Sequence, residues 1–315
     1  MYKQAWDKIL DAKSIVIASH IHPDGDTIGS SLGLYSVLKE LGKRVSLYNA
    51  TKNELPKEFD FLEGYSKIQD KLPKFFDLII SCDSASSDRI RIQKDGNFLI
   101  NIDHHKSNTN FGDIDVVLPE ASSAGMVVYK LLKANNIKIS KKSATALYTS
   151  IAEDTDFFRY GGIDATTFDA TADLVRCGAD PEYISGKVKS RRSLAKTRLM
   201  AYMLSNFNLH VDGLVASIIF DKKILEATGA KKSDTKNIVS MLRDIVTVKV
   251  SVMVLEEENS CKISLRSDGD VDVSNISAIY GGGGHKGAAG FSVKNTDLIS
   301  TCKEIVEKIK IEVIR

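Results

Sequence analysis

The sequence is poor in cysteine, proline and long apolar runs, and each shortage excludes a class of protein. Its 315 residues include four cysteines and five prolines, and no two cysteines form a CxxC motif. This spacing argues against a structural zinc site and against a redox dithiol. No stretch approaches the about 18 apolar residues of a membrane-spanning helix, and the charged N-terminus lacks the apolar region of a signal peptide. We therefore expect a cytoplasmic protein with free thiols.

An excess of charge of one sign is also missing, because 43 basic residues are balanced by 41 acidic ones. This balance excludes a broad nucleic-acid-binding surface and a strong attraction to membranes. A nucleic-acid substrate would have to be short or held in a local pocket. Hydrophobic residues make up 43% of the chain, as in ordinary globular proteins. At about 150 residues per domain, the length predicts two domains.

The first half of the sequence alternates short apolar runs with helical patterns. The runs expected to be strands are Ser14–Ser19, Arg44–Asn49, Asp77–Cys82 and Asn97–Ile102. A helix is expected over Thr27–Leu41, and the pattern from Ser122 to Cys177 is mostly helical. Together they predict an α/β domain over residues 1–184, with a doubly wound, mainly parallel sheet.

A basic segment at residues 185–208 separates this domain from a second one. We interpret the segment as a helical linker with a solvated basic face, the alternative being a surface that faces phosphate. Residues 209–315 then form a smaller α+β domain. Its expected strands are Leu214–Phe220, Val246–Leu255 and Cys261–Leu265, and its expected helices are Ser233–Ile245 and Thr296–Lys310.

Histidine and aspartate follow three of the predicted strands at the point where each strand ends. In chain order, these residues are His20, Asp24, Asp26, Asp83, Asp103, His104 and His105. One further acid, Asp154, follows a helical run. The carboxyl ends of parallel strands meet at one edge of a sheet, where α/β proteins bind ligands. A single aspartate there is usually a helix cap, and Asp26 alone is explained in this way.

Several carboxylates at one edge repel one another unless a divalent cation binds between them. Aspartate and histidine without cysteine favour Mn²⁺ or Mg²⁺. These side chains offer more ligands than one metal ion can use if that ion also keeps a bound water. They suit two ions about 3.5–4 Å apart, which activate water and hold phosphate oxygens. This pattern favours phosphoester hydrolysis.

A glycine-rich stretch, GGGGHKGAAG at residues 281–290, is the second functional signal. It contains GxGxxG, but a helical pattern precedes it and a strand pattern follows it, the reverse of a dinucleotide-binding motif. The sequence also fails to match a Walker A motif. Two interpretations remain equal: backbone N–H groups that approach a phosphate, with Arg266, His285 and Lys286 as further donors, or a flexible loop that ends a helix.

These motifs together resemble the DHH phosphoesterases, a family that includes RecJ-like nucleases, family II pyrophosphatases and NrnA-type oligoribonucleases. The matching segments, in order along nearly the whole chain, are HIHPDGDTIGS, SCDSASSDR, Asp103-His104-His105, Asp154-Thr155, and GGGGHKGAAG preceded by SLRS. The length is most similar to the NrnA type. The resemblance implies a DHH catalytic domain followed by the DHH-associated substrate-binding domain.

The resemblance also implies a role for each motif residue. The first metal ion would be held by His20, Asp24 and Asp83. The second would be held by Asp26, Asp83, His104 and Asp154, with Asp83 bridging the two. His105 would face the scissile phosphate or its leaving oxygen, and Asp103 would orient the neighbouring histidines. The substrate's terminal phosphate or nucleotide would be bound by Arg266, Gly283, Gly284 and His285.

Two positions depart from the family pattern or add to it. Asp156 stands where the family commonly has glycine, which leaves the geometry of that loop open. His22 is an additional histidine that the metal pattern does not require. We expect His22 to be a polar loop residue, the alternative being a contact with substrate.

The resemblance implies a metal-dependent hydrolase, with Mn²⁺ expected and Mg²⁺ as the alternative. It would degrade short oligoribonucleotides, including pApA-like dinucleotides, to mononucleotides. Conversion of 3′-phosphoadenosine 5′-phosphate to AMP is a further expected activity. An inorganic pyrophosphatase, a RecJ-like exonuclease and a non-catalytic nucleotide sensor stay open as alternatives. The sequence is compatible with a homodimer but contains nothing that demonstrates one.

Overall fold

A computed structural model of the chain describes residues 1–160, 162–190, 192–235, 238–294 and 296–314. The chain divides into two compact units, residues 1–191 and 192–315, each with its own sheet and hydrophobic core. No helix within the described ranges is long and apolar enough to cross a membrane.

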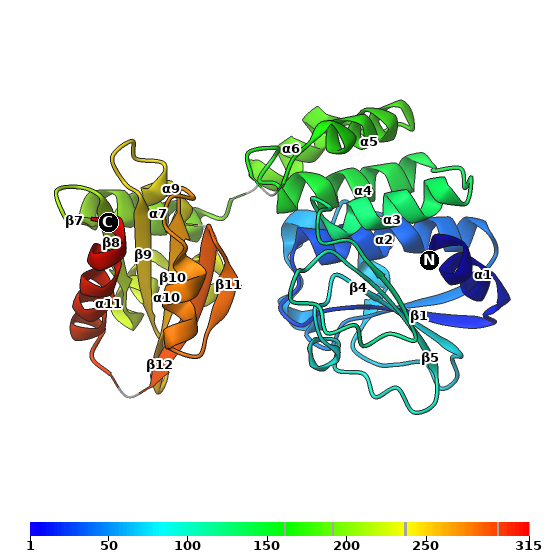
Figure 1. Cartoon of the computed structure of the whole chain (residues 1–315), viewed down its shortest axis with the longest axis horizontal. Helices are drawn as coiled ribbons and strands as arrows, with labels where there is room; N and C mark the ends of the chain where they lie inside the picture. Colours follow the sequence, from blue (N-terminus) through cyan, green and yellow to red (C-terminus); the bar gives the residue numbers. More distant parts are fainter. Residues whose placement is uncertain (161, 191, 236–237, 295, 315) are drawn as a thin grey trace. The chain divides into compact units, whose positions relative to one another are not determined.

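The first unit is built on a six-stranded parallel sheet with the order β3-β2-β1-β4-β5-β6 (Figure 1). Its strands are β1 Ser14–Ser19, β2 Arg44–Tyr48, β3 Ile68–Gln69, β4 Leu78–Cys82, β5 Phe98–Asp103 and β6 Ile114–Val117. This order confirms the predicted doubly wound sheet. The edge strands β3 and β6 were not predicted, because two and four residues give too little alternation to recognise.

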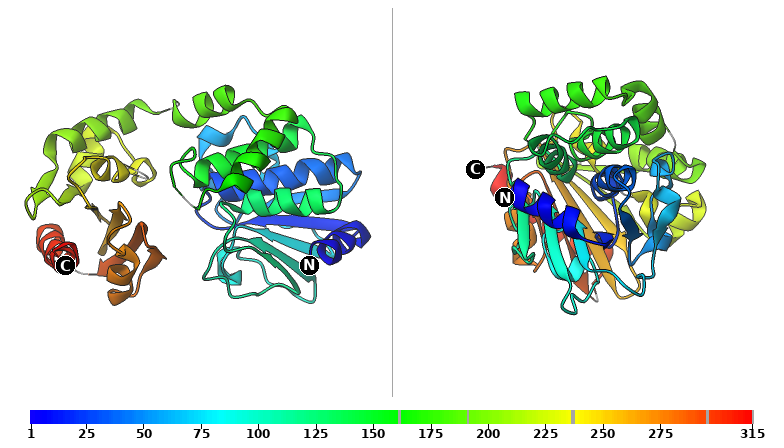
Figure 2. Two further views of the ribbon diagram at one scale, coloured as in Figure 1. Left: turned by 45° about the horizontal axis from the view of Figure 1, so that its top comes forward. Right: turned by 90° about the vertical axis from the view of Figure 1, so that its right-hand side faces the viewer.

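Helices cover one face of this sheet (Figure 2). They are α1 Tyr2–Asp11, α2 Gly25–Glu40, α3 Ala124–Ala134 and α4 Lys141–Asp154, with α5 Ala165–Arg176 and α6 Pro181–Lys189 packed outside against α4. The opposite face is covered by loops and short 3₁₀ turns, over a smaller core that includes Val16, Ile79 and Ile90. The helices α2 and α4 position the functional site, because their facing ends carry predicted metal ligands.

Three glycines allow α2 to pack closely against α4. Gly25, Gly29 and Gly33 recur every fourth residue and so lie on one side of α2. A Cβ atom at Gly29 would lie 2.6 Å from the backbone oxygen of Ala146 and 2.7 Å from the Cβ of Ser150. Any side chain at this position must push the two helices apart.

We expect Gly29→Ala to lower the free energy of unfolding by about 2 kcal/mol, the usual cost of an overpacked core. Chemical denaturation followed by circular dichroism measures this loss. The matched control is Gly186→Ala in α6, where no atom lies within 4 Å of the added Cβ. It should leave stability unchanged or raise it by roughly 0.5–1 kcal/mol. A Gly29→Ala protein as stable as wild type would contradict the close packing.

The second unit has a six-stranded sheet with the order β11-β12-β10-β9-β8-β7, in which only the β8–β9 pair is parallel. Its strands are β7 Asn208–His210, β8 Val215–Phe220, β9 Val250–Glu256, β10 Ser260–Ser267, β11 Gly283–His285 and β12 Ala288–Lys294. Its helices are α7 Leu194–Asn206, α8 Lys222–Thr228, α9 Ser240–Arg243, α10 Val273–Ile279 and α11 Leu298–Val313. Helices α10 and α11 cover one face, and α7, α8 and α9 cover the other.

Two expectations for this unit need correction. The helix predicted over Ser233–Ile245 is wrong as one element: the described part holds a 3₁₀ turn at Lys232–Thr235 and the short α9, while 236–237 lie outside the described residues. The carboxylate of Asp234 accepts a hydrogen bond from the backbone of Lys231, which favours a turn over a helix. The second concerns the glycine-rich stretch, for which two interpretations were open. Gly281, with φ +72°, does end α10, but Gly283–His285 forms the edge strand β11 of a hairpin and is not a flexible loop.

Candidate metal centre

The predicted metal ligands meet where the strand order of the first sheet reverses. From β1 the chain passes to β2 on one side, while β4 and β5 lie on the other side of β1. The loops that leave the carboxyl ends of β1 and β4 therefore diverge and leave a crevice between them, the usual ligand site of such sheets. His20 follows β1, Asp83 follows β4, and His104 follows β5.

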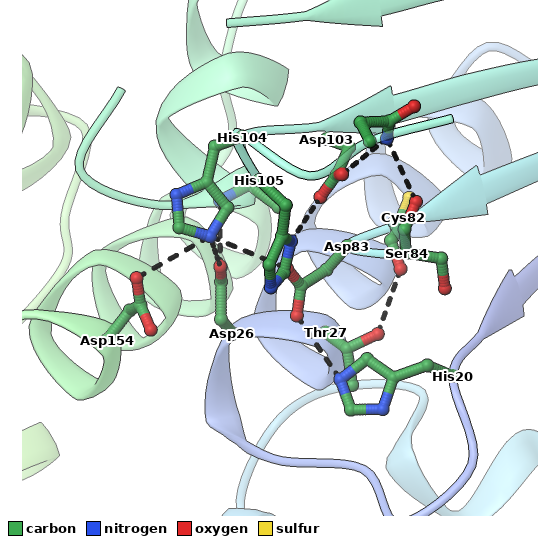
Figure 3. Close-up of polar contacts among 12 residues, drawn as sticks. His20, Asp26, Thr27, Cys82, Asp83, Ser84, Asp103, His104, His105 and Asp154 are labelled. Atoms are coloured by element: carbon green, nitrogen blue, oxygen red, sulfur yellow. Dashed lines mark hydrogen bonds and ion pairs between the residues drawn. The ribbon is translucent and has the colours of Figure 1, made fainter. Parts of the chain in front are cut away.

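The structure brings all six predicted ligands together. Figure 3 labels His20, Asp26, Asp83, His104 and Asp154 among them. Three groups of side chains have ligand atoms within 4.8 Å of one another: His20 with Asp24 and Asp83, Asp26 with His104 and Asp154, and Asp83 with His104 and His105. Asp83 and His104 each belong to two of these groups. The first group is the set that the resemblance implies for one ion, and the second group is the set that it implies for the other ion without the bridging Asp83.

The spacing within the cluster suits a metal ion better than direct hydrogen bonds. The Nε2 atom of His104 lies 3.4 Å from Asp26 Oδ2, 3.6 Å from Asp83 Oδ1 and 3.6 Å from Asp154 Oδ2. These distances exceed the usual 2.7–3.2 Å of a hydrogen bond. Ligand atoms bound about 2.1 Å from one cation, at angles near 90–110°, lie roughly 3.0–3.4 Å apart. The donor set and its spacing therefore fit a divalent cation.

Backbone carbonyl groups contact Nδ1 of both histidine rings, and for His104 this contact fixes the tautomer that metal binding needs. Nδ1 of His20 lies 2.8 Å from the carbonyl oxygen of Ile21, and Nδ1 of His104 lies 3.1 Å from that of Ala121. Nδ1 of His20 also lies 3.2 Å from Nη2 of Arg89, a group that only donates, so the contact with Ile21 does not by itself fix the tautomer of that ring. A carbonyl oxygen only accepts hydrogen bonds, so Nδ1 of His104 carries the proton. Nε2 then presents its lone pair to the carboxylates, the arrangement found behind metal-ligating histidines.

Asp26 is held from behind by groups that sequence reasoning missed. Its carboxylate accepts hydrogen bonds from the backbone N–H of Ala124 at 2.8 Å, the N–H of Gly125 at 3.1 Å and the hydroxyl of Ser150. The two amides belong to the first turn of α3, where free N–H groups and the helix dipole favour a negative charge. The sequence did contain a signal for the two amides. Ser123, followed by Ala124, Gly125 and an apolar run, indicates the start of a helix.

The helix-cap interpretation applies to Asp24 rather than Asp26. The side chain of Asp24 accepts a hydrogen bond from the backbone of Thr27 at 3.2 Å and caps α2. Asp26 lies in the first turn of that helix and is 1% exposed. Both aspartates are thus fixed by the same helix start, two residues apart.

The backbone of Asp83 is strained. Its φ angle is +61°, in the left-handed region that residues with a side chain rarely occupy. The Asp83 N–H still donates to the carbonyl oxygen of Ile102 at 2.9 Å, so the neighbouring strands hold this conformation. Strain of this kind costs about 1–3 kcal/mol and is concentrated at functional sites. Here it directs the carboxylate into the crevice, with Oδ2 3.3 Å from His20 Nε2.

The pKa values show that the cluster carries an excess of negative charge. Burial raises the pKa of Asp26, and the charges of Asp83 and Asp154 raise it further. Burial, opposed by His104 and reinforced by Asp83, raises the pKa of Asp154 to about 7. Burial alone lowers the pKa of His20, but Asp24 and Asp83 outweigh it and raise that pKa to about 10. In each case a proton takes the place that a cation is expected to occupy.

The imidazole ring of His105 is oriented by a buried carboxylate, that of Asp103. Its Nδ1 lies 2.8 Å from Oδ1 of Asp103, which is fully buried and also accepts a hydrogen bond from the Asn108 amide. Burial lowers the pKa of His105, but the bond to Asp103 outweighs this effect and raises it. The bond from Nδ1–H to Asp103 therefore fixes the orientation of the His105 ring. Asn108 was missed in the sequence, since it belongs to no recognised motif.

The predicted substrate-binding residues lie in the second unit. His285, Ala288 and Arg266 are paired across β11, β12 and β10, and directly paired residues point to the same face of a sheet. Within the described ranges no carboxylate lies at ion-pair distance from Arg266. Its guanidinium donates a hydrogen bond to the backbone carbonyl of the preceding residue, Leu265, at 2.9 Å. Burial and the nearby Arg243 lower the pKa of Arg266. An anion at this face would compensate these charges.

The glycines of this stretch have a packing role as well. A Cβ atom at Gly284, where φ is +144°, would lie 2.4 Å from the backbone oxygen of Ala288. A Cβ atom at Gly283 would meet nothing within 4 Å. Glycine is therefore required at position 284 by the hairpin itself, while the backbone at position 283 stays accessible to a ligand.

The two positions that depart from the family pattern lie beside the cluster. His22 is exposed and pairs with Glu54, outside the three ligand groups. Asp156 has φ +46° and ends α4: its N–H donates to the Glu153 carbonyl, and the N–H of Phe157 donates to the Ala152 carbonyl. This is a Schellman motif, whose left-handed position usually holds glycine. Aspartate there costs about 1 kcal/mol of backbone strain relative to glycine.

Comparison with known proteins gives consistent matches over both units. The model of the DHH family, N-terminal domain, matches residues 14–151, and the DHHA1 domain matches residues 213–312. A Thermus thermophilus protein named bifunctional oligoribonuclease and PAP phosphatase NrnA is 34% identical over 96% of this chain and 90% of its own length. A Bacillus subtilis protein of the same name is 27% identical over 92% and 95%. A solved Bacteroides fragilis exopolyphosphatase-related protein has a TM-score of 0.92 and 30% identity, covering 100% of this chain and 97% of that one.

Proposed function

Because this chain belongs to the DHH family, we propose that it is a two-metal hydrolase that degrades short oligoribonucleotides to mononucleotides and converts 3′-phosphoadenosine 5′-phosphate to AMP. The observation that carries the proposal is the position of Asp83. One of its oxygens lies 3.3 Å from His20 Nε2 and the other lies 3.6 Å from His104 Nε2. A single carboxylate thus faces both ligand groups, as a bridge between two ions requires.

The proposed ions are Mn²⁺, with Mg²⁺ as the alternative, since the ligands are carboxylate and imidazole without thiolate. When bound, two such ions activate water and stabilise the charge that develops on phosphate oxygens. Residues His20, Asp24 and Asp83 would hold one ion. Residues Asp26, Asp83, His104 and Asp154 would hold the other. A cytoplasmic location stays part of the proposal as predicted from the sequence, with which a homodimer is compatible.

The proposed role of His105 is to hold a proton at Nε2. Asp103 engages Nδ1–H and keeps the imidazole in one orientation. A protonated Nε2 can donate a hydrogen bond to a phosphate oxygen and pass its proton to the leaving oxygen.

We expect Arg266→Ala to raise KM for a dinucleotide by roughly 10- to 100-fold, since a charge-assisted bond to phosphate contributes about 1.5–3 kcal/mol. The kcat value should change less than about threefold, because the residue binds a terminal group and not the reacting one. Steady-state kinetics on pApA measures both constants. Lys262→Ala, an exposed residue on the same strand, is the control. An unchanged KM would contradict the proposed role of Arg266 in binding the terminal phosphate or nucleotide.

Three substrates test the proposal in parallel with Mn²⁺: a 5′-phosphorylated RNA dinucleotide, 3′-phosphoadenosine 5′-phosphate, and pyrophosphate. Release of mononucleotides and AMP, abolished by a chelator and restored by Mn²⁺, supports the proposed function. Turnover of pyrophosphate alone would replace it with a pyrophosphatase. No turnover of any substrate by protein shown to bind Mn²⁺ would replace it with a longer nucleic-acid substrate or a nucleotide sensor.

A further inference from the structure

The Asp156 side chain ties the end of α4 to the last helix of the first unit. One carboxylate oxygen pairs with the ammonium group of Lys189, and the other lies 3.1 Å from Nη1 of Arg159. The Lys189 ammonium also lies 4.9 Å from the centre of the Phe157 ring. The carboxylate and the neighbouring ring therefore hold the same lysine from two sides.

Backbone geometry does not explain why aspartate occupies this position. The left-handed φ of +46° favours glycine, and Phe157 and Phe158 continue the left-handed turn with φ values of +58° and +64°. Three consecutive residues with side chains in this region are unusual. We attribute the aspartate to the contacts of its carboxylate, whose partners among the described residues are Lys189 and Arg159.

Asp156 and Lys189 are close in sequence to two different parts of the chain. Asp156 lies two residues after Asp154, whose Oδ2 is 3.6 Å from Nε2 of His104. Lys189 is the last residue of α6, and the chain divides into its two units between 191 and 192. The ion pair thus connects the metal-bearing end of α4 to the place where the chain leaves the first unit.

We propose that Asp156 is a positioning residue that, with Lys189, anchors the end of α6, and so the start of the segment leading to the second unit, at the metal-bearing end of α4. The inference rests on the proposed function, because one of its two readouts is the turnover of the proposed dinucleotide substrate. The side chains are partly exposed, so the pair contributes little to global stability and its variants should fold.

The test compares pApA, the proposed dinucleotide substrate, with bis(p-nitrophenyl) phosphate, which needs only the metal centre. Asp156→Asn keeps the shape and left-handed tolerance of aspartate but loses the charge, and Lys189→Met keeps the apolar stem. We expect each to lower kcat/KM for pApA by about five- to tenfold, with bis(p-nitrophenyl) phosphate changed less than about twofold. The double variant should lose no more than either single variant, since both remove one interaction.

Two further variants separate positioning from a merely structural role. Asp156→Gly relieves the strained backbone, so its Tm should equal or exceed that of wild type while its loss on pApA matches that of Asp156→Asn. Lys133→Met removes a comparable ion pair, to Asp173 at 3.1 Å in the same unit, and should leave both substrates unaffected. Wild-type kinetics on pApA in Asp156→Asn and Lys189→Met, or equal losses on both substrates, would overturn the anchor.

Amide hydrogen exchange tests the anchor independently of any substrate. The Asp156→Asn variant should exchange faster than wild type over residues 184–190 and at the wild-type rate within α4. Unchanged exchange over residues 184–190 would overturn the anchor even if pApA turnover falls. If wild-type protein fails to cleave pApA, the proposed function fails, and this exchange measurement alone decides the anchor.

Discussion

Replacing Asp83 by asparagine should lower the hydrolysis rate of pApA by at least about 10³-fold, equivalent to roughly 4 kcal/mol of lost transition-state stabilisation. The carboxylate faces His20 on one side and His104 on the other, so the loss of its charge weakens both ligand groups at once. Asparagine tolerates the left-handed φ of +61° nearly as well as aspartate. The substitution therefore removes charge while preserving the local backbone.

Steady-state turnover by protein equilibrated with Mn²⁺ measures this effect, with metal content determined on the same sample. Asp88→Asn is the matched control, because Asp88 is an acid on the same loop after β4 and belongs to none of the ligand groups. It should retain wild-type activity. Near-wild-type turnover by Asp83→Asn with bound Mn²⁺ would show that the cluster is not the catalytic centre.

His104→Ala should lower turnover by about 10²- to 10³-fold, the second largest effect that we expect. The Nε2 atom of this ring faces the carboxylates of Asp26, Asp83 and Asp154. Its removal takes away the only imidazole of that group, and three carboxylates must then share one cation. We expect Mn²⁺ to raise the Tm of wild type but to raise that of the variant much less.

His22→Ala provides the control for this experiment, because His22 is an exposed histidine on the loop after β1 and lies outside the ligand groups. Its kcat and KM should stay within about twofold of wild type, as for an ordinary surface substitution. A large rise in KM for His22→Ala would identify a substrate contact instead. Wild-type turnover by His104→Ala would contradict its role as a metal ligand.

The position of the candidate ligands could be predicted from sequence because parallel strands end at a common edge. Three apolar runs each lead into histidine or aspartate, and the strand order places β1, β4 and β5 side by side. Asp154 was harder to place from pattern alone, since it ends a helix that packs against α2 through Gly25, Gly29 and Gly33. Its location depends on close helix packing and not on local periodicity.

The supporting contacts could not be predicted, because they join residues far apart in the chain. Ser150 reaches Asp26 only once α2, α3 and α4 are packed together. The incorrect helix over Ser233–Ile245 has a local cause, because apolar spacing outweighed turn formation at Asp234 in the prediction. The glycine-rich hairpin is also a local pairing, of Gly283–His285 with residues 288–290, and a run of glycines gives no alternation that would indicate it.

The ligands of the centre are spread from residue 20 to residue 154, over almost the whole first unit. A chain emerging from the ribosome can therefore assemble the site only after α4 has been synthesised and packed against α2. Partly folded intermediates, and fragments that stop before α4, would carry the DHH motif without a working centre. The long sequence separation thus makes a complete ligand set conditional on a nearly complete first unit.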